Sequence, residues 1–341
     1  MNRCVTNAGL LAAVHLPLLA IFFRDLWSRP DFRFFPLAIC AMAWVIGWRC
    51  PRNLSRAGSG VRFLESLLLL GSVGLLATAV TIWSPVLSAV AAIFMLGALL
   101  LHFAGPQNIS CIAPVWVVAW LIVPLPHNAD AWILKEQRRL TAEGSSLALD
   151  SLHVHHQLLG TTLEFGSSTY CVEDLSGGAA SLRAFLALTA LYLAWTRRPP
   201  LGAIFLCMAA VAWFGAGNVL HIVAAVFAQF WLQFDVSQSQ VGDVLNWTAF
   251  LLAFIMVIST DALLSFFLGG IPLSPLPESQ NPWSRRWNRW IAGAPPSGAA
   301  LESQNPAMAE PNVGWSLLGS KCLTGAAIAL GILQLLIVTV P

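Results

Sequence analysis

The stretch LEFGSSTYCVEDLSGGAASLRAFLAL (163–188) and the later stretch WFGAGNVLHIV (213–223) decide how the chain is interpreted. In the first, a polar loop runs directly into an apolar run that begins at Ala179. In the second, Asn218 and His221 interrupt another apolar run. Polar groups inside a membrane segment mark a functional site by default, because burying them in lipid costs free energy. The groups that gather near this membrane boundary are Cys171, Glu173, Asp174, Ser176, Asn218 and His221.

The composition is that of a membrane protein. Hydrophobic residues make up 57% of the 341 residues and charged residues only 10%, and the mean hydropathy is +0.72. A soluble domain carries about 25% charged residues. The net charge of +2 and the scattered Lys and Arg residues give no sign of a nucleic-acid partner. The seven cysteines show no CxxC spacing, so we expect no disulfide framework, no zinc site and no cofactor.

Nine segments are apolar over nearly the length that a membrane helix needs, which is about 20 residues. They are 7–23, 34–48, 63–83, 85–104, 109–126, 179–196, 201–232, 246–270 and 316–340. We therefore predict an all-α polytopic bundle of about nine spans, with eight or ten as alternatives. Only Trp83-Ser84-Pro85 joins the third span to the fourth, which forces an antiparallel hairpin.

The distribution of basic residues predicts the orientation. With the N-terminus in the cytoplasm, 11 Lys and Arg residues fall inside and 6 fall outside, and Arg183 is left at a helix end. The positive-inside rule favours this arrangement. We therefore predict a multi-pass protein of the cytoplasmic (inner) membrane, with the lipid bilayer as its surroundings and loop 127–178 on the extracytoplasmic side.

Two segments outside the spans have distinct patterns. In loop 127–178, residues 130–152 have apolar groups spaced for a helix lying at the membrane interface, and two short strands are expected to follow. Residues 271–315 are rich in Pro, Ser, Asn and Gln and contain ESQNP twice, which predicts a cytoplasmic linker of low structural content. The predicted organisation is a membrane domain (1–270), this linker (271–315) and a C-terminal helix (316–340).

A series of short motifs follows in order along residues 123–267. They are VPLP (123–126), Leu149-Asp150, LEF (163–165), VEDLSGGAASLRAFLAL (172–188), RRP (197–199), NVLHI (218–222) and STDALLSFF (259–267). In this order and spacing the sequence resembles the exosortase/archaeosortase family of membrane transpeptidases. The resemblance implies protein sorting, in which the C-terminal tail of an exported protein (a short motif, a membrane helix and a basic end) is recognised and then cleaved or transferred.

The resemblance also implies a Cys, an Arg and a His at the outer membrane face, where a thiolate attacks the tail and the basic groups lower its pKa and hold the oxyanion. This chain has Leu175, His221 and Gly242 at those positions. Losing one member of a nucleophilic set removes most of its rate enhancement. We therefore favour an inactive or substrate-binding relative, with Ser176, Arg183 and Asn218 as substrate-binding residues.

An active peptidase with a rebuilt Cys171–His221–Asp243 set is the first alternative. If residues 171–175 are extended, Cys171 lies about 13 Å from position 175 at roughly 3.3 Å per residue, and the loop composition favours that form. Ser176 has no base adjacent in sequence to make it a nucleophile. A transporter or channel subunit is the second alternative, but the halves show no internal repeat.

Other polar residues have weaker patterns. His153, His155 and His156 form an HxHH cluster, but no Asp, Glu or Cys nearby completes a metal site, so we predict none. His15, Glu65 and His102 lie inside apolar runs and are expected to pair with one another or to face a cavity. For Arg183 two roles are open, a side chain that reaches the outer interface or a replacement for the missing anion-holding Arg.

Overall fold

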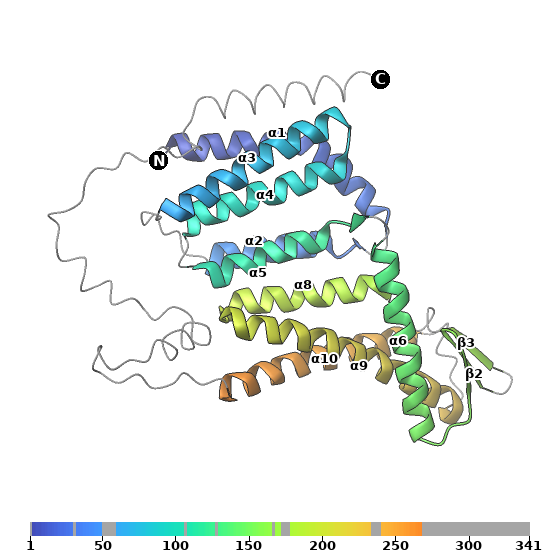
Figure 1. Cartoon of the computed structure of the whole chain (residues 1–341). Helices are drawn as coiled ribbons and strands as arrows, with labels where there is room; N and C mark the ends of the chain where they lie inside the picture. Colours follow the sequence, from blue (N-terminus) through green and yellow to red (C-terminus); the bar gives the residue numbers. More distant parts are fainter. Residues whose placement is uncertain are drawn as a thin grey trace, which may run out of the picture. The chain divides into compact units, whose positions relative to one another are not determined.

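The structure is a computed structural model that describes the backbone of residues 2–29, 32–49, 59–105, 108–126, 129–165, 168–171, 178–232 and 240–267. At several element ends, including 168–171 and 229–232, it describes the backbone without the side chains. The chain divides into two compact units (Figure 1). Of the described residues, those in 1–123 and 193–199 belong to the first unit, and those in 124–192 and 200–270 belong to the second.

The first unit is built from five apolar helices. They are α1 (Asn2–Trp27), α2 (Phe35–Arg49), α3 (Ser59–Thr81), α4 (Pro85–Ala104) and α5 (Ile109–Ile122). Helices α1, α3 and α5 pack against α4, and α2 packs against α5. Between α3 and α4 the predicted tight hairpin is confirmed. The hydroxyl of Ser84 accepts a hydrogen bond from the Leu87 N–H at 3.3 Å, and Pro85 occupies the first helical position, where its missing N–H costs nothing.

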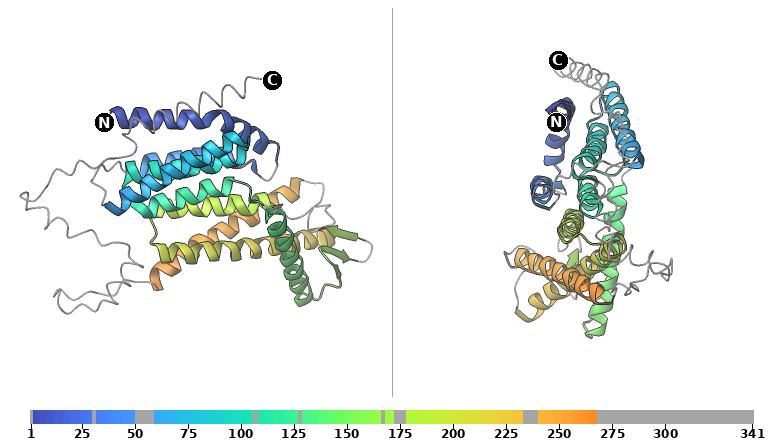
Figure 2. Two further views of the ribbon diagram at one scale, coloured as in Figure 1. Left: turned by 45° about the horizontal axis from the view of Figure 1, so that its top comes forward. Right: turned by 90° about the vertical axis from the view of Figure 1, so that its left-hand side faces the viewer.

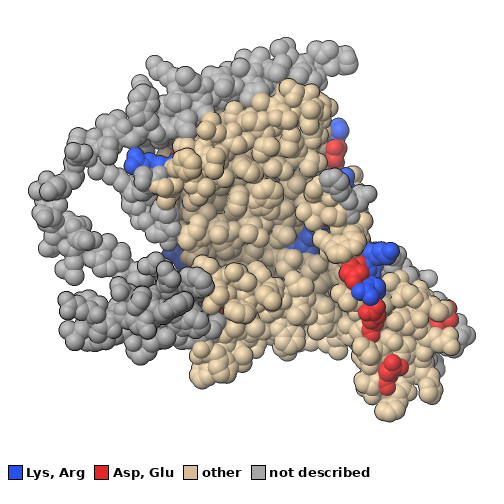
Figure 3. Space-filling view, viewed as in Figure 1, with Lys and Arg blue, Asp and Glu red and all other residues tan. Residues whose placement is uncertain are grey.

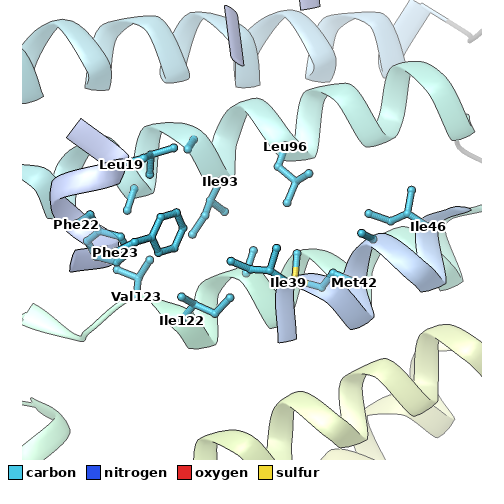
Figure 4. Close-up of a pocket in the computed structure, with 14 residues that line it drawn as sticks. Leu19, Phe22, Phe23, Ile39, Met42, Ile46, Ile93, Leu96, Ile122 and Val123 are labelled. Atoms are coloured by element: carbon cyan, nitrogen blue, oxygen red, sulfur yellow. The ribbon is translucent and has the colours of Figure 1, made fainter. Parts of the chain in front are cut away.

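An apolar core and an apolar cavity lie among these helices. Val14 of α1 packs with Leu69 and Leu76 of α3 and with Met95 of α4. A cavity of about 290 Å³ opens among α1, α2, α4 and α5 (Figure 4). Its lining consists of Leu19, Phe22, Phe23, Ile39, Met42, Ala43, Ile46, Ala89, Ala92, Ile93, Leu96, Ala119, Ile122 and Val123. No polar side chain is among them.

Polar side chains of the first unit form pairs between helices. The Nδ1 atom of His102 on α4 lies 2.9 Å from Oε1 of Glu65 on α3. Two turns further along α3, the Ser72 hydroxyl lies 3.3 Å from Nε2 of His15 on α1. The expectation that polar residues in the apolar runs pair with one another is thus confirmed for Glu65 and His102.

The second unit joins three membrane helices to a crossing helix and a small sheet. Its elements are α6 (Ala129–Ser151), β1 (Gln157–Leu159), β2 (Thr162–Phe165), β3 (Ser168–Cys171), α8 (Gly178–Thr196, whose residues from 193 on belong to the first unit), α9 (Pro200–Leu232) and α10 (Gln240–Phe267). The strands form one antiparallel sheet in the order β1-β2-β3. The prediction of two strands was therefore one strand short. All three strands have only three or four residues, which is too few for an alternating pattern to separate them.

Helix α6 crosses α9 steeply, and α9 packs against α10 at a crossing angle (Figures 1 and 2). At the crossing, a Cβ on Gly144 would meet Cγ2 of Val219 at 2.9 Å, so the close approach of the two helices needs glycine there. Leu149, Leu163 and Ile222 bury their side chains in the core between α6, β2 and α9. On the face shown in Figure 3, most of the charged side chains of the second unit gather over α6, as expected for an interfacial helix.

The all-α membrane fold predicted from the sequence is confirmed. Four helices are long and apolar enough to cross a membrane, namely Gly60–Thr81, Pro85–Phe103, Pro200–Ala228 and Val244–Phe267. The shorter apolar helices are Phe35–Arg49, Ile109–Ile122 and Leu182–Thr196. Eight of the nine predicted spans coincide with described helices. Linker 271–315 and span 316–340 lie outside the described residues.

One cysteine contradicts the sequence analysis. Cys111 of α5 is disulfide-bonded, although the irregular spacing of the seven cysteines predicted no disulfide framework. Spacing along the sequence does not reveal which cysteines the packing of helices brings together.

Candidate functional site

Helix α9 carries two buried polar residues on its side toward α10. Asn218 and His221 lie one turn apart and are only 7% and 4% exposed. Asn218 lines a small cavity together with Asn246 of α10, and the His221 ring lies beside the backbone of Gly242. Residues 242 and 246 of α10 are also one turn apart. Between the two helices, His221 therefore lies opposite Gly242, and Asn218 lies opposite Asn246.

These buried polar groups lack hydrogen-bond partners. Within the part of the chain that the structure describes, nothing bonds to Nδ2 of Asn218 or to either ring nitrogen of His221. The backbone of Gly242 is close to His221 but does not meet hydrogen-bond geometry. A buried polar atom without a partner costs about 1–3 kcal/mol. The site therefore retains unused hydrogen-bonding capacity in an apolar environment, which a water molecule or a ligand can satisfy.

The cavity at Asn218 is small because the two helices approach closely. A Cβ on Gly217 would lie 3.2 Å from Cβ of Ala253 and 3.3 Å from the carbonyl oxygen of Ala249. The enclosed volume is about 10 Å³, roughly enough for one water molecule. Its lining consists of Phe214, Gly217, Asn218, Asn246, Ala249, Phe250 and Ala253.

An aromatic cluster holds α8 against α9 and α10 beside this cavity. The fully buried ring of Phe185 lies 5.4 Å from the ring of Phe214 and 5.2 Å from that of Phe250, measured between centroids. Further along, the Tyr192 hydroxyl donates to Oδ2 of Asp261 at 2.6 Å, and Asp261 is only 4% exposed. Asp261 belongs to the motif STDALLSFF (259–267) but was not predicted to have a role, although an acidic residue inside the apolar run 246–270 is itself a signal.

Arg183 of α8 is engaged in an ion pair with Asp130 of α6. Oδ2 of Asp130 also accepts a hydrogen bond from the Leu125 N–H at 3.0 Å. The Arg183 side chain is 13% exposed. The structure thus balances the charge of Arg183 within the protein and uses it to hold the start of α6 against α8.

The other predicted site residues are described only in part. Cys171 ends β3, with its Cα opposite that of Thr162, so its backbone is extended as expected. Its side chain, that of Asp243 on α10, and residues Leu175 and Ser176 lie outside the described part of the chain. The Cys171–His221–Asp243 set therefore stays a prediction. His221 and Gly242, two of the three positions that the family resemblance singles out, lie next to each other.

In the HxHH cluster, the His156 ring forms two hydrogen bonds within the protein. Nδ1 of His156 lies 2.8 Å from the Val154 carbonyl oxygen, and Nε2 lies 2.7 Å from the Ser146 hydroxyl. A carbonyl only accepts, so Nδ1 carries the hydrogen and Nε2 accepts from Ser146. His156 thus fastens the segment before β1 to α6. Among the described residues, no group of three or more His, Cys, Asp or Glu side chains could hold a metal ion.

Comparison with known proteins gives one match. The family model described as Transmembrane exosortase (Exosortase_EpsH) matches residues 27–259, which is more than half of the 341-residue chain. No curated protein and no solved structure matches the chain. The matched range includes the whole of α6, the sheet, α8 and α9, and most of α10.

Proposed function

Because the chain belongs to the transmembrane exosortase family, we propose that it binds the C-terminal sorting tails of exported proteins without cleaving them. The site faces the extracytoplasmic side of an inner membrane. The lipid bilayer and the tails are its partners, and the bound tail is a short motif followed by a membrane helix and a basic end. In this proposal the protein is a pseudoenzyme of a transpeptidase family.

The observation that carries this proposal is the environment of His221. The family resemblance implies an Arg at this position, and an Arg is always charged. Here a buried imidazole that has no hydrogen-bond partner among the described residues lies beside Gly242, which has no side chain at all. A thiolate needs a cationic or basic neighbour to be populated at neutral pH. Since the sequence has Leu175 at the nucleophile position, neither the nucleophile nor a permanent cation is in place.

The same observation leaves one active alternative. Both ring nitrogens of His221 are free to accept or donate a proton within the described part of the chain, as a general base requires. If Cys171 and Asp243 turn toward His221, a Cys–His–Asp set results. This alternative predicts cleavage that depends on Cys171.

The test is co-expression of the full chain with an exported reporter in a host without related enzymes. The reporter ends in a polar motif, an apolar membrane helix and an Arg-rich end. We expect the reporter to co-purify at full length, with no shortened product, and Cys171→Ser to change nothing. We also expect Leu175→Cys, His221→Arg and Gly242→His to be needed together before any shortened product appears.

Two outcomes would contradict the proposal. Shortened reporter that disappears with Cys171→Ser would establish the rebuilt active site in place of the inactive one. If the tailed reporter co-purifies no better than a reporter without the tail, the proposal that the protein binds the tail is wrong.

A further inference from the structure

A groove opens where α6 crosses α9. Its volume is about 310 Å³, at the lower end of the range of about 300–1,000 Å³ found for ligand sites. Trp132 and Leu140 on the α6 side are 67% and 56% exposed, so the groove is open along that helix. The lining residues are Trp132, Ile133, Glu136, Gln137, Leu140, Thr141, Leu182, Val211, Phe214, Gly215 and Val219.

One polar group in this groove lacks a partner. Oε1 of Gln137 is buried and receives no hydrogen bond in the described part of the chain. The neighbouring Glu136 is already bonded to Arg139 at 3.1 Å. A carboxamide both donates and accepts, which matches the N–H and C=O groups of a peptide backbone. A lipid acyl chain offers no hydrogen-bonding group, so it would leave Oε1 of Gln137 unsatisfied.

The groove and the cavity at Asn218 share one lining residue of α9. Phe214 lines both of them. Nδ2 of Asn218, in the second cavity, is unpartnered among the described residues. His221 follows one turn further along α9.

The α9 wall of the groove is open at one glycine. A Cβ on Gly215 would have no atom within 4 Å. The situation at Gly144, where the same two helices touch, is the opposite, since a Cβ there would meet Val219 at 2.9 Å. A larger side chain at Gly215 therefore fills the groove without pushing α6 away from α9.

We propose that the groove between α6 and α9 binds the start of the apolar segment of a C-terminal sorting tail, in an extended form that pairs its backbone with Gln137. This inference rests on the proposed function and assigns the place where the tail enters. The tail then runs along α9, so its preceding short motif lies toward the part of α9 that carries Asn218 and His221. A peptide is chosen over a lipid because Oε1 of Gln137 has no hydrogen-bond partner among the described residues, and an acyl chain supplies none.

Photo-crosslinking in the full chain tests the location. Benzoylphenylalanine replaces Leu140 at the mouth of the groove or, as a control, Met208, which is 64% exposed on α9 and outside the groove lining. With the tailed reporter co-expressed, we expect at least about tenfold more crosslinked reporter from position 140 than from position 208.

Filling the groove provides the second measurement. Gly215→Leu should lower reporter co-purification and crosslinking at position 140 by about tenfold. Gly74→Leu on α3, where a Cβ likewise meets no atom within 4 Å, should leave both unchanged. Gln137→Leu, which keeps the bulk and removes the amide, should lower both by about fivefold, as the loss of one peptide hydrogen bond does.

The outcomes separate this inference from the proposed function. Equal crosslinking from positions 140 and 208, or full co-purification with Gly215→Leu, contradicts the groove while leaving tail binding intact. Crosslinks at position 140 that contain lipid alone, with a reporter that still co-purifies, would show that the groove takes an acyl chain. A reporter that never co-purifies removes both proposals.

Discussion

In the first unit Glu65 and His102 satisfy one another between α3 and α4, whereas in the second unit Asn218 and His221 face α10 without hydrogen-bond partners among the described residues. Both sets lie within apolar helices, and Glu65, Asn218 and His221 are buried while the His102 side chain is 18% exposed. A paired polar group in such a place stabilises the contact between helices. An unpaired one lowers stability, and its retention is explained when a ligand supplies the missing partner. The comparison assigns a structural role to the first set and a binding role to the second.

The largest change in stability is expected when one member of the Glu65–His102 pair is removed. His102→Leu leaves the Glu65 carboxylate, whose side chain is only 8% exposed, without its partner. We expect the free energy of unfolding to fall by about 2–3 kcal/mol, because removing one member of a buried pair leaves the other uncompensated. Reversible unfolding in mixed detergent micelles, followed by circular dichroism, measures the change.

The double change Glu65→Leu with His102→Leu is the matched control. Since it removes both polar groups, stability should return to within about 1 kcal/mol of that of the unmodified protein. A double variant as unstable as His102→Leu alone would mean that the two side chains contribute by packing, and the structural role assigned to the pair would be wrong.

In the second unit, removal of a buried polar side chain is expected to raise stability instead of lowering it. His221→Leu removes two buried nitrogens that have no partner among the described residues, so we expect the free energy of unfolding to rise by about 1 kcal/mol. At the same time, co-purification of the tailed reporter should fall, because the imidazole no longer meets the bound motif. The same unfolding assay and the reporter assay give the two numbers.

Phe185→Leu separates this effect from general loosening of the second unit. The Phe185 ring is fully buried against Phe214 and Phe250, so its truncation should lower stability and weaken binding together. Loss of stability in His221→Leu as well would show that the imidazole has a partner in the protein and would end the contrast between the units.

The sequence predicted the elements of this fold better than the contacts between them. The spans follow from about 20 apolar residues in a row, and the α3–α4 hairpin follows from Trp83-Ser84-Pro85, so both are local signals. The interfacial helix was expected at 130–152 and lies at Ala129–Ser151, since its apolar spacing is also local. Two strands were expected where there are three, because strands of three or four residues carry too little pattern to be counted.

Side-chain partners could not be predicted in the same way. Glu65 and His102 are 37 positions apart, and Tyr192 and Asp261 are 69 apart, so their pairing depends on how the helices rotate and shift against one another. The ion pair of Arg183 could not be predicted either, because Asp130 lies in a separate element and no spacing connects the two residues. His221 and Gly242, which lie next to each other, were singled out only through the family resemblance.

The smallest change in stability is expected for an exposed pair outside the membrane spans, Glu136 and Arg139 on α6. Nε of Arg139 donates to the two carboxylate oxygens of Glu136 at 3.1 and 3.2 Å. The hydrogen bond from Arg139, aided by its charge, lowers the pKa of the Glu136 carboxyl below its ordinary value.

A group whose pKa is lowered by folding stabilises the folded state above its ordinary pKa, and the contribution disappears as the pH falls through the lowered value. Glu136→Gln should therefore lower the melting temperature slightly at pH 7, and by less at about pH 3, below the ordinary pKa of the carboxyl. Thermal unfolding at the two pH values measures the difference, and Glu164→Gln on β2 makes the same chemical change away from α6. If Glu136→Gln lowers the melting temperature equally at both pH values, the effect comes from packing of the side chain. The exposed Glu136–Arg139 ion pair would then contribute nothing to stability, unlike the buried Glu65–His102 pair.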